Sequence, residues 1–305
     1  MDGDMGDSGE REFLRRLRAR AGSGTSVLRV GMGDDAAVLR PPRGSEVVVT
    51  TDLMLEGVHF RRDWHSAGVV GARCLTRGVS DLAAMGARPM AAFLSLGVPA
   101  GDLAWGEEFL EGVLGLAAEY GVELAGGDLA ESPKGVVADI VLTGSVPRGR
   151  ALLRSGARRG DFVYVTGELG GAAADLARLR SGGRAEHVPR ARVEVGEFLR
   201  AKGIASACID LSDGLSTDLD HLCEESGVAA EVSSAAVPVA RGSSLEMAAN
   251  GGEDYELLFT AAGRVPKVIA GVAVSRIGRV VKARRGGRVW MDGCVLEVRG
   301  WEHFG

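Results

Sequence analysis

The sequence predicts a two-domain fold of the α/β (α+β) class. The chain has 305 residues, of which 46% are hydrophobic and 25% are charged, and this length suits two domains better than one. Short β-branched segments alternate with segments whose apolar residues have helical spacing. The alternation closes near Pro147 and starts again at residues 161–167 (DFVYVTG). We therefore expect one domain before Pro147 and a second after it.

Composition excludes several classes of protein. A formal net charge of −5 argues against a nucleic-acid-binding protein, and no apolar run approaches the roughly 20 residues of a membrane span. The acidic N-terminal segment MDGDMGDSGERE has neither a signal-peptide core nor an arginine-rich transit pattern, so we expect a cytoplasmic protein. Widely spaced cysteines predict neither a zinc site nor a disulfide framework; they are Cys74, Cys208, Cys223 and Cys294.

The elements expected in the first half follow from this periodicity and from glycine and proline punctuation. In order they are a basic helical segment at 11–20, a strand at 27–30, a glycine turn at 31–36, a strand at 46–51 that ends in Thr50-Thr51-Asp52, a loop reaching His59, a helix at about 66–87, a strand at 90–99, a helix around 109–117, a strand at 122–125, a turn at 126–128 and a strand at 136–146.

The second half is expected to alternate in the same way. In order its elements are an arginine-rich loop at 149–160, a strand at 161–167, helices around 170–180 and 190–202, a strand, turn and helix at 206–227, a turn at 251–254, and strands at about 228–232, 255–260, 273–280 and 287–298. Ser212 or Asp213 is the natural N-cap of the helix within 206–227.

Acidic and hydroxyl residues recur where the expected apolar strands meet turns. These units are Gly33-Asp34-Asp35, Thr50-Thr51-Asp52, Gly126-Gly127-Asp128, Asp210-Leu211-Ser212-Asp213 and Gly251-Gly252-Glu253-Asp254, and a sixth, Ser80-Asp81, lies within an expected helix. Any one of these units alone is weak evidence for a metal site, because acidic residues in turns usually cap a helix or face the solvent. Converging carboxylates repel one another and need cations, and Mg²⁺ completes its coordination with water and substrate phosphate. No lysine stands in a G-K-[ST] context, so a P-loop is absent. The pattern predicts a site with several Mg²⁺ ions for ATP or a related phosphate compound.

Six motifs carry a family resemblance. They are GMGDDAAV at 31–38, TTDLMLEGVHF at 50–60, SDLAAMGARP at 80–89, GGD at 126–128, DLSDGLSTDL at 210–219 and GGEDYELLF at 251–259. In this order they closely resemble the thiamine-monophosphate kinase family. That family belongs to the ATP-binding superfamily of aminoimidazole-ribonucleotide synthetase and selenophosphate synthetase. The resemblance runs from about Arg11 to the closing GWEHFG.

The resemblance implies an architecture and a reaction. The expected fold is synthetase-like, with 11–147 as the metal-binding, ATP-binding and dimerisation domain and 148–305 as the C-terminal α/β domain. Residues 1–10 match nothing in the family, and we expect them to form a disordered tail. The N-terminal sheet would pair with that of a partner to make a homodimer. The expected reaction is direct in-line transfer of the γ-phosphoryl group of ATP to thiamine monophosphate, giving thiamine diphosphate. Because the acceptor is already an ionised phosphate, no residue is assigned as a general base.

Residue roles also follow from the resemblance, position by position. The implied Mg²⁺ ligands are Asp35, Thr50, Thr51, Asp52, Asp81, Asp128, Asp210 and Asp213. The implied contacts to ATP are Gly127, Asp128, Arg154 and Ser212. The implied contacts to thiamine monophosphate are His59, Glu253 and Trp301.

One departure and three alternatives accompany this interpretation. Leu129-Ala130 stands where the family more often has Thr-Thr, which removes a hydroxyl near the phosphates. Aminoimidazole-ribonucleotide synthetase shares the aspartates but lacks GGEDYELLF and TTDLMLEGVHF. Selenophosphate synthetase needs a reactive N-terminal cysteine or selenocysteine, whereas the first cysteine here is Cys74. A non-catalytic nucleotide or metal sensor would have lost some ligands, and here every carboxylate position is filled.

Overall fold

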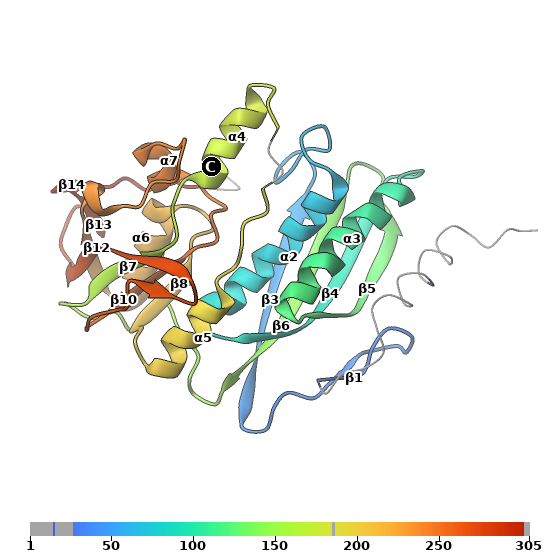
Figure 1. Cartoon of the computed structure of the whole chain (residues 1–305), viewed down its shortest axis with the longest axis horizontal. Coiled ribbons are helices and arrows are strands. Elements are labelled where there is room, and N and C mark those ends of the chain that lie inside the picture. The colour runs from blue at the N-terminus through green and yellow to red at the C-terminus, as the bar shows by residue number, and fades with distance from the viewer. Residues whose placement is uncertain (1–14, 16–26, 185–186, 302–305) are drawn as a thin grey trace, which may run out of the picture. The chain divides into compact units, whose positions relative to one another are not determined.

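The structure of the chain is a computed structural model, which describes residues 15, 27–184 and 187–301 (Figure 1). It divides into two compact units. Unit 1 contains the residues up to Gly78 together with Pro89–Ser145, and unit 2 contains Val79–Arg88 together with the residues from Val146 onward. The expected segments 1–10 and 11–20 lie outside the described residues, except for Arg15, which is helical.

Unit 1 is built on a four-stranded sheet with the strand order β3-β6-β4-β5. Strands β4 and β5 are parallel, and helices α2 and α3 lie along one face of the sheet (Figure 1). A small antiparallel hairpin of β1 and β2 precedes β3. The bounds are β1 Leu28–Val30, β2 Val38–Leu39, β3 Ser45–Leu55, α2 Ala67–Ala84, β4 Arg88–Val98, α3 Leu103–Tyr120, β5 Glu123–Glu131 and β6 Val137–Pro147.

Two helices of unit 1 approach each other through glycines. A Cβ atom added to Gly71 of α2 would lie 1.9 Å from the carbonyl oxygen of Phe109, and one added to Gly112 of α3 would lie 1.8 Å from that of Gly68. Glycine costs helix stability in isolation, but here its lack of a side chain lets the two backbones touch. Phe109 is fully buried at this contact.

We expect Gly112→Ala to destabilise the protein by about 2–3 kcal/mol, because the added methyl group overlaps backbone that cannot move aside cheaply. Gly115→Ala, one turn further along α3, is the matched control. Nothing lies within 4 Å of a Cβ atom built at Gly115, so that change should be neutral or stabilising by up to about 1 kcal/mol. Urea unfolding of both variants measures the difference. Equal effects would show that the glycine contact does not hold the two helices together.

Unit 2 is built on an eight-stranded sheet. Its main path is β14-β13-β9-β12-β7-β10-β8, and β11 pairs with β12. Helix α6 packs on this sheet and contributes Leu215, Leu219 and Leu222 to a large buried apolar cluster. The bounds are β7 Phe162–Thr166, α4 Gly171–Arg180, α5 Val193–Lys202, β8 Ala207–Asp210, α6 Leu215–Ser226, β9 Val228–Val232, η1 Ser234–Ala236, α7 Leu245–Asn250, β10 Leu257–Ala261, β11 Val268–Ile269, β12 Val272–Lys282, β13 Val289–Met291 and β14 Cys294–Val295.

The α/β class and the order of the main elements are confirmed, and four local predictions are wrong. The strand predicted at 46–51 continues to Leu55, because no turn-forming residue interrupts it before Gly57. Residues 126–128 lie inside β5 and do not form a turn. The strand predicted at 287–298 is a hairpin, since Asp292 and Gly293 both have positive φ, 49° and 86°, as an Asp-Gly hairpin turn requires. The fourth error is the N-cap of α6, described below.

No helix in the described part of the chain is long and apolar enough to cross a membrane.

Candidate functional site

Three of the predicted metal ligands lie in the interior of β3. The hydroxyl of Thr51 donates a hydrogen bond to Oδ1 of Asp139 on the neighbouring strand β6, at 2.9 Å. The Oδ1 atom of Asp52 accepts a hydrogen bond of 3.3 Å from Nε of Arg77 on α2. The other oxygen of Asp52, Oδ2, is buried and has no hydrogen-bond partner among the described residues. Thr50 precedes this pair and is half-buried.

The surroundings of Asp52 disfavour its charged form. Burial raises the pKa of Asp52, Arg77 opposes this rise, and the negative charge of Asp139 adds to it. A buried carboxylate oxygen without a partner is costly unless a cation neutralises it. The donor set of carboxylate and hydroxyl oxygens fits a hard divalent cation such as Mg²⁺. Sequence reasoning missed Asp139, although its charge within the apolar strand VVADIV was a visible signal.

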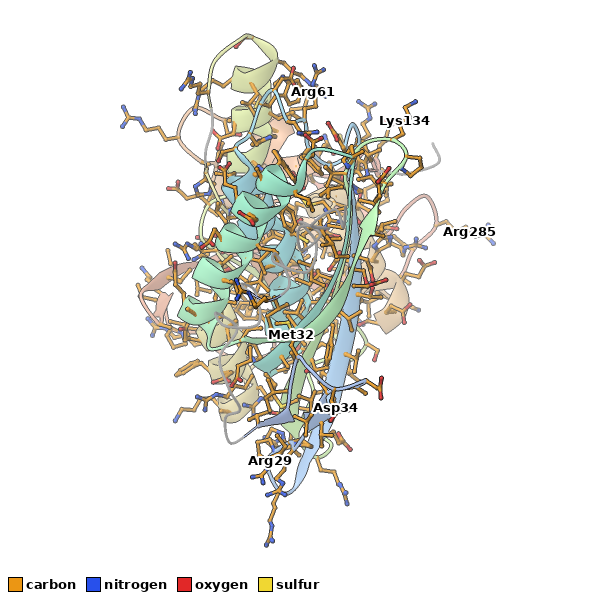
Figure 2. All side chains as sticks on the ribbon, turned by 90° about the vertical axis from the view of Figure 1, so that its right-hand side faces the viewer. Arg29, Met32, Asp34, Arg61, Lys134 and Arg285 are labelled. Carbon is orange, nitrogen blue, oxygen red and sulfur yellow. The ribbon has the colours of Figure 1, made fainter. Side chains whose placement is uncertain are left out.

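The two remaining predicted ligands of unit 1, Asp35 and Asp128, are exposed. The backbone amide of Asp35 donates to the carboxylate of Asp34 at 3.0 Å, and Figure 2 shows Asp34 pointing away from the ribbon. The carboxylate of Asp128 accepts from the amide of Leu129 at 3.0 Å. The backbone of β5 needs glycine just before Asp128. Gly127 has φ +153°, and a Cβ atom there would lie 1.9 Å from the carbonyl oxygen of Leu94 on β4.

His59 follows β3 in a tight turn. Its amide donates to the carbonyl oxygen of Leu55 at 3.0 Å, and its Nδ1 accepts from the amide of Leu55, also at 3.0 Å. Because Nδ1 is an acceptor, the proton of the neutral ring lies on Nε2. The ring is therefore held on the end of a rigid strand.

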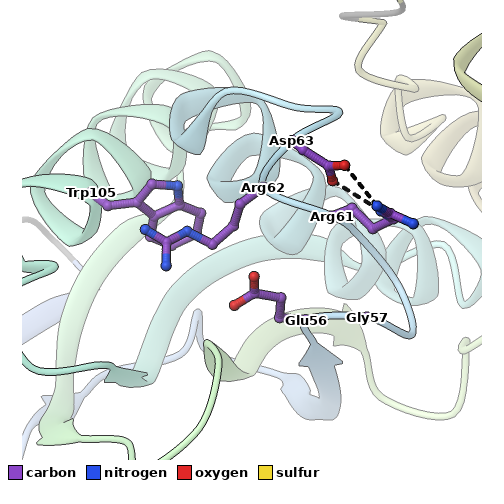
Figure 3. A pocket seen from close by; sticks show the side chains of 6 residues that line it. All are labelled: Glu56, Gly57, Arg61, Arg62, Asp63 and Trp105. Atoms are coloured by element: carbon purple, nitrogen blue, oxygen red, sulfur yellow. Dashed lines mark hydrogen bonds and ion pairs between the residues drawn. The ribbon is translucent and has the colours of Figure 1, made fainter. Parts of the chain in front are cut away.

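Beside this turn an open pocket of about 680 Å³ lies on unit 1 (Figure 3). Arg62 lies over the ring of Trp105, 5.2 Å from its centroid, and forms an ion pair of 2.7 Å with Asp102. Figure 3 shows Arg61 turned toward Asp63, with which it makes an ion pair of 2.7 Å. These arginines are occupied by local carboxylates, so we assign them no ligand. The lining residues are Glu56, Gly57, Arg61, Arg62, Asp63 and Trp105.

In unit 2, Asp210 is buried at the end of β8. Its Oδ2 accepts a hydrogen bond of 2.7 Å from the hydroxyl of Ser80, which directly precedes the predicted ligand Asp81 on α2. Asp81 itself is half-buried. The structure thus brings together the neighbourhoods of two predicted ligands that are 129 positions apart in the chain.

The N-terminus of α6 is arranged differently from the prediction. Gly214 is the N-cap, and neither Ser212 nor Asp213 caps the helix. The carboxylate of Asp218 reaches back and accepts from the amides of Asp213 and Gly214 at 3.1 and 3.0 Å. Burial raises the pKa of Asp218 well above its usual range, and the charges of Asp210 and Asp213 raise it further. Sequence reasoning gave Asp218 no role, although it stands within the quoted DLSDGLSTDL motif.

Three residues that are predicted to contact ATP or thiamine monophosphate lie together around the turn before α6; they are Ser212, Glu253 and Trp301. The amide of Glu253 donates to the carbonyl oxygen of Ser212 at 2.8 Å, and the amide of Trp301 donates to that of Asp213 at 3.2 Å. Glu253 also lines a pocket of about 430 Å³. Trp301 is 49% exposed. Arg154 lies in a separate loop. Its backbone carbonyl oxygen accepts a hydrogen bond of 2.9 Å from the hydroxyl of Ser226.

Within the described residues, no group of three or more His, Cys, Asp or Glu side chains is arranged to hold a metal ion. The predicted ligands fall in both units. Their assignment to Mg²⁺ therefore stays a prediction, supported by the buried oxygen of Asp52 and by the donor chemistry.

Comparison with known proteins first defines a class. The chain matches the family "AIR synthase related protein, N-terminal domain" over residues 33–146 and the corresponding C-terminal domain family over residues 158–291. Together these matches cover most of both units and agree with the mixed α/β architecture. The chain is an AIR synthase related protein of two domains.

Closer relatives identify the particular family. A thiamine-monophosphate kinase of Salmonella typhimurium is 36% identical over 97% of this chain and 98% of its own length. The crystal structure of the thiamine-monophosphate kinase from Stenotrophomonas maltophilia K279a has a TM-score of 0.82 at 34% identity and covers 94% of this chain and 98% of the relative. A structure of AaThiL complexed with AMPPCP and TMP has a TM-score of 0.77 at 30% identity and covers 100% of this chain and 99% of that one. The chain belongs to the thiamine-monophosphate kinase family, as its motifs predicted.

Proposed function

We propose that this protein catalyses the ATP-dependent phosphorylation of thiamine monophosphate to thiamine diphosphate, with release of ADP. The observation that carries the proposal is the cluster of motif residues Ser212, Asp213, Glu253 and Trp301, which backbone hydrogen bonds join in unit 2. Family membership supports the same activity. A relative in complex with the ATP analogue AMPPCP and with TMP supports the choice of substrates.

The chain's residues suit a transfer between two phosphates. The acceptor oxygen carries no proton that must be removed near neutral pH, so the barrier is the repulsion between two anions and their alignment. Bound Mg²⁺ would supply neutralisation of the phosphate charge. We propose as its ligands Asp35, Thr50, Thr51, Asp52, Asp81, Asp128, Asp210 and Asp213.

The remaining assignments divide between the two substrates. For ATP we propose Gly127, Asp128, Arg154 and Ser212; Gly127 and Asp128 are exposed on β5. For thiamine monophosphate we propose His59, Glu253 and Trp301. His59 orients the acceptor as a ring fixed at Nδ1, and the exposed indole of Trp301 stacks on a heteroaromatic ring. We keep 11–147 and 148–305 as the two domains, and because ATP is an intracellular nucleotide we place the reaction in the cytoplasm.

We also propose a homodimer formed through the sheet of unit 1. The side chains of β3 alternate, with Val48 and Met54 buried and Val47, Val49 and Leu53 about half exposed. The exposed set lies on one face of the strand, as the period of two requires. A row of exposed apolar residues of this kind marks a protein interaction surface.

The dimer has its own test. Val49→Lys should convert the protein to a monomer, because the charge would be buried unpaired in the interface. Light scattering measures the molar mass. Val268→Lys in unit 2, at a comparably exposed valine, should leave the mass unchanged. A wild-type protein with the mass of one chain would rule out this interface.

The substrate choice is tested by a screen with purified protein, ATP and Mg²⁺. Release of ADP with thiamine monophosphate, and not with free thiamine or formylglycinamidine ribonucleotide, is the expected result. ADP release only with formylglycinamidine ribonucleotide would favour the synthetase alternative. Binding of ATP without turnover of any acceptor would favour a sensor.

A further inference from the structure

The segment Glu253–Glu256 of unit 2 is held in an unusual backbone conformation. Glu253 has φ +66° and Tyr255 has φ +52°, although both residues carry a Cβ atom that disfavours the left-handed region. Such conformations persist only where the surrounding structure fixes them. Two preceding glycines permit the approach to the α6 turn: a Cβ atom on Gly252 would lie 2.5 Å from the carbonyl oxygen of Ser212.

The carboxylate of Asp254 anchors the middle of this segment. It accepts hydrogen bonds from the amides of Gly170, at 2.6 Å, and Ala172, at 3.2 Å, at the start of α4. Burial raises the pKa of Asp254 to about 6, against the opposite effect of these amides. The side chain is therefore ionised at pH 7.5 and can accept both bonds.

Glu256, two positions after Asp254, supplies a second anchor. Glu256 is buried and accepts from both Nε and Nη2 of Arg192, the former at 2.7 Å, and from the hydroxyl of Thr166 at 2.5 Å. Gly167 makes room for it, since a Cβ atom there would lie 1.9 Å from Oε1 of Glu256. The partners of the two anchors therefore come from three elements: β7, the start of α4 and the start of α5.

Backbone hydrogen bonds complete the arrangement. Glu253 and Tyr255 donate to the carbonyl oxygens of Ser212 and Leu211, at 2.8 and 2.9 Å. Glu253 thus lies between the Asp254 anchor and these backbone hydrogen bonds, and it lines the 430 Å³ pocket together with Asp254 and Glu256.

We propose that Asp254 is a positioning residue, which fixes the backbone of Glu253 so that the Glu253 carboxylate faces thiamine monophosphate. This inference rests on the proposed function for the identity of the ligand. Asp254 itself makes no contact with the substrate. Asp254 affects the binding of thiamine monophosphate only through Glu253, and it does not affect the binding of ATP.

The test is a double-substitution cycle read by calorimetry. Asp254→Asn keeps the shape of the side chain but puts an amide donor in place of one acceptor oxygen, so it can satisfy only one of the two amides. We expect the Kd of thiamine monophosphate to rise about tenfold, while the Kd of the ATP analogue AMPPCP changes less than twofold. In the Glu253→Gln background, Asp254→Asn should change the Kd of thiamine monophosphate less than twofold, because the group it positions is already altered.

Asp292→Asn is the matched control. Asp292 also lies in unit 2, and its carboxylate also accepts a hydrogen bond from a backbone amide, that of Ser234 at 3.2 Å. That variant should bind thiamine monophosphate like wild type. An unchanged Kd in Asp254→Asn, or effects of the two substitutions that multiply in the double variant, would overturn the inference. Parallel weakening of both ligands with a lowered Tm would also overturn it, since it would indicate a purely structural role.

Binding is measured separately from turnover, so the two hypotheses fail differently. A wild-type protein that binds thiamine monophosphate but does not phosphorylate it would refute the proposed function and leave the cycle informative. A wild-type protein that does not bind thiamine monophosphate at all would refute both.

Discussion

Asp52→Asn is expected to lower kcat for phosphoryl transfer by about a hundredfold or more, the usual cost of removing one group that stabilises transition-state charge. The Oδ2 atom of Asp52 is buried and has no hydrogen-bond partner among the described residues, so a cation bound there would offset the cost of burying its charge. Asparagine keeps the shape but loses the negative charge. Raising the Mg²⁺ concentration should restore part of the activity, because the defect lies in metal affinity.

The folded protein should tolerate this change. Burial already raises the pKa of Asp52, so the charged carboxylate is held in the fold at a cost, and its removal should shift Tm by only a few degrees. Asp175→Asn, at the surface ion pair with Arg178 in unit 2, is the control and should be fully active. Wild-type kcat in Asp52→Asn at low Mg²⁺ would show that this carboxylate is not a metal ligand.

Glu256→Gln is expected to lower the free energy of unfolding by about 3 kcal/mol, at the lower end of the range for breaking a buried ion pair. Glu256 is 4% exposed, and its carboxylate receives two guanidinium hydrogen bonds from Arg192 and one from Thr166. Glutamine retains one acceptor oxygen, but its amide NH₂ group would face a hydrogen-bond donor of Arg192 or Thr166. The positive charge of Arg192 then remains in the half-buried site without its carboxylate.

Denaturant unfolding with Glu231→Gln as control measures this effect. Glu231 also pairs with two arginines, Arg279 and Arg284, but on the protein surface. Exposed ion pairs contribute roughly 0–1 kcal/mol, so the control should change little. Similar losses in the two variants would mean that burial does not strengthen the Glu256 network.

The fold class could be predicted from the sequence because it leaves local signals, whereas the site residues were assigned from motifs and stay predictions. Glycine, aspartate and threonine motifs stand at recognisable positions, and the periodicity of 66–87 indicated α2 almost to its ends. The errors came from motif geometry. Thr50-Thr51-Asp52 and Gly127-Asp128 look like turn residues, but sheet pairing keeps both within strands, since tertiary pairing overrides local propensity.

Partners that are distant in the sequence could not be predicted. Asp139 lies beside Thr51 only because β6 neighbours β3. Asp218 replaces the expected N-cap from inside its own helix. Glu256 was visible in GGEDYELLF, but its partners Thr166 and Arg192 are 90 and 64 positions away. Such contacts depend on strand order and helix packing, which no local pattern specifies.

We expect the γ-phosphoryl group of ATP to move directly to the phosphate of thiamine monophosphate. The most direct measurement incubates the purified protein with Mg²⁺, thiamine monophosphate and ATP labelled with ³²P at the γ position, and then follows the label. We predict that the label appears in the terminal phosphate of thiamine diphosphate, in equal amount to the ADP formed, and that Asp52→Asn reduces both together. Label found only in inorganic phosphate, with thiamine monophosphate unchanged, would contradict direct transfer.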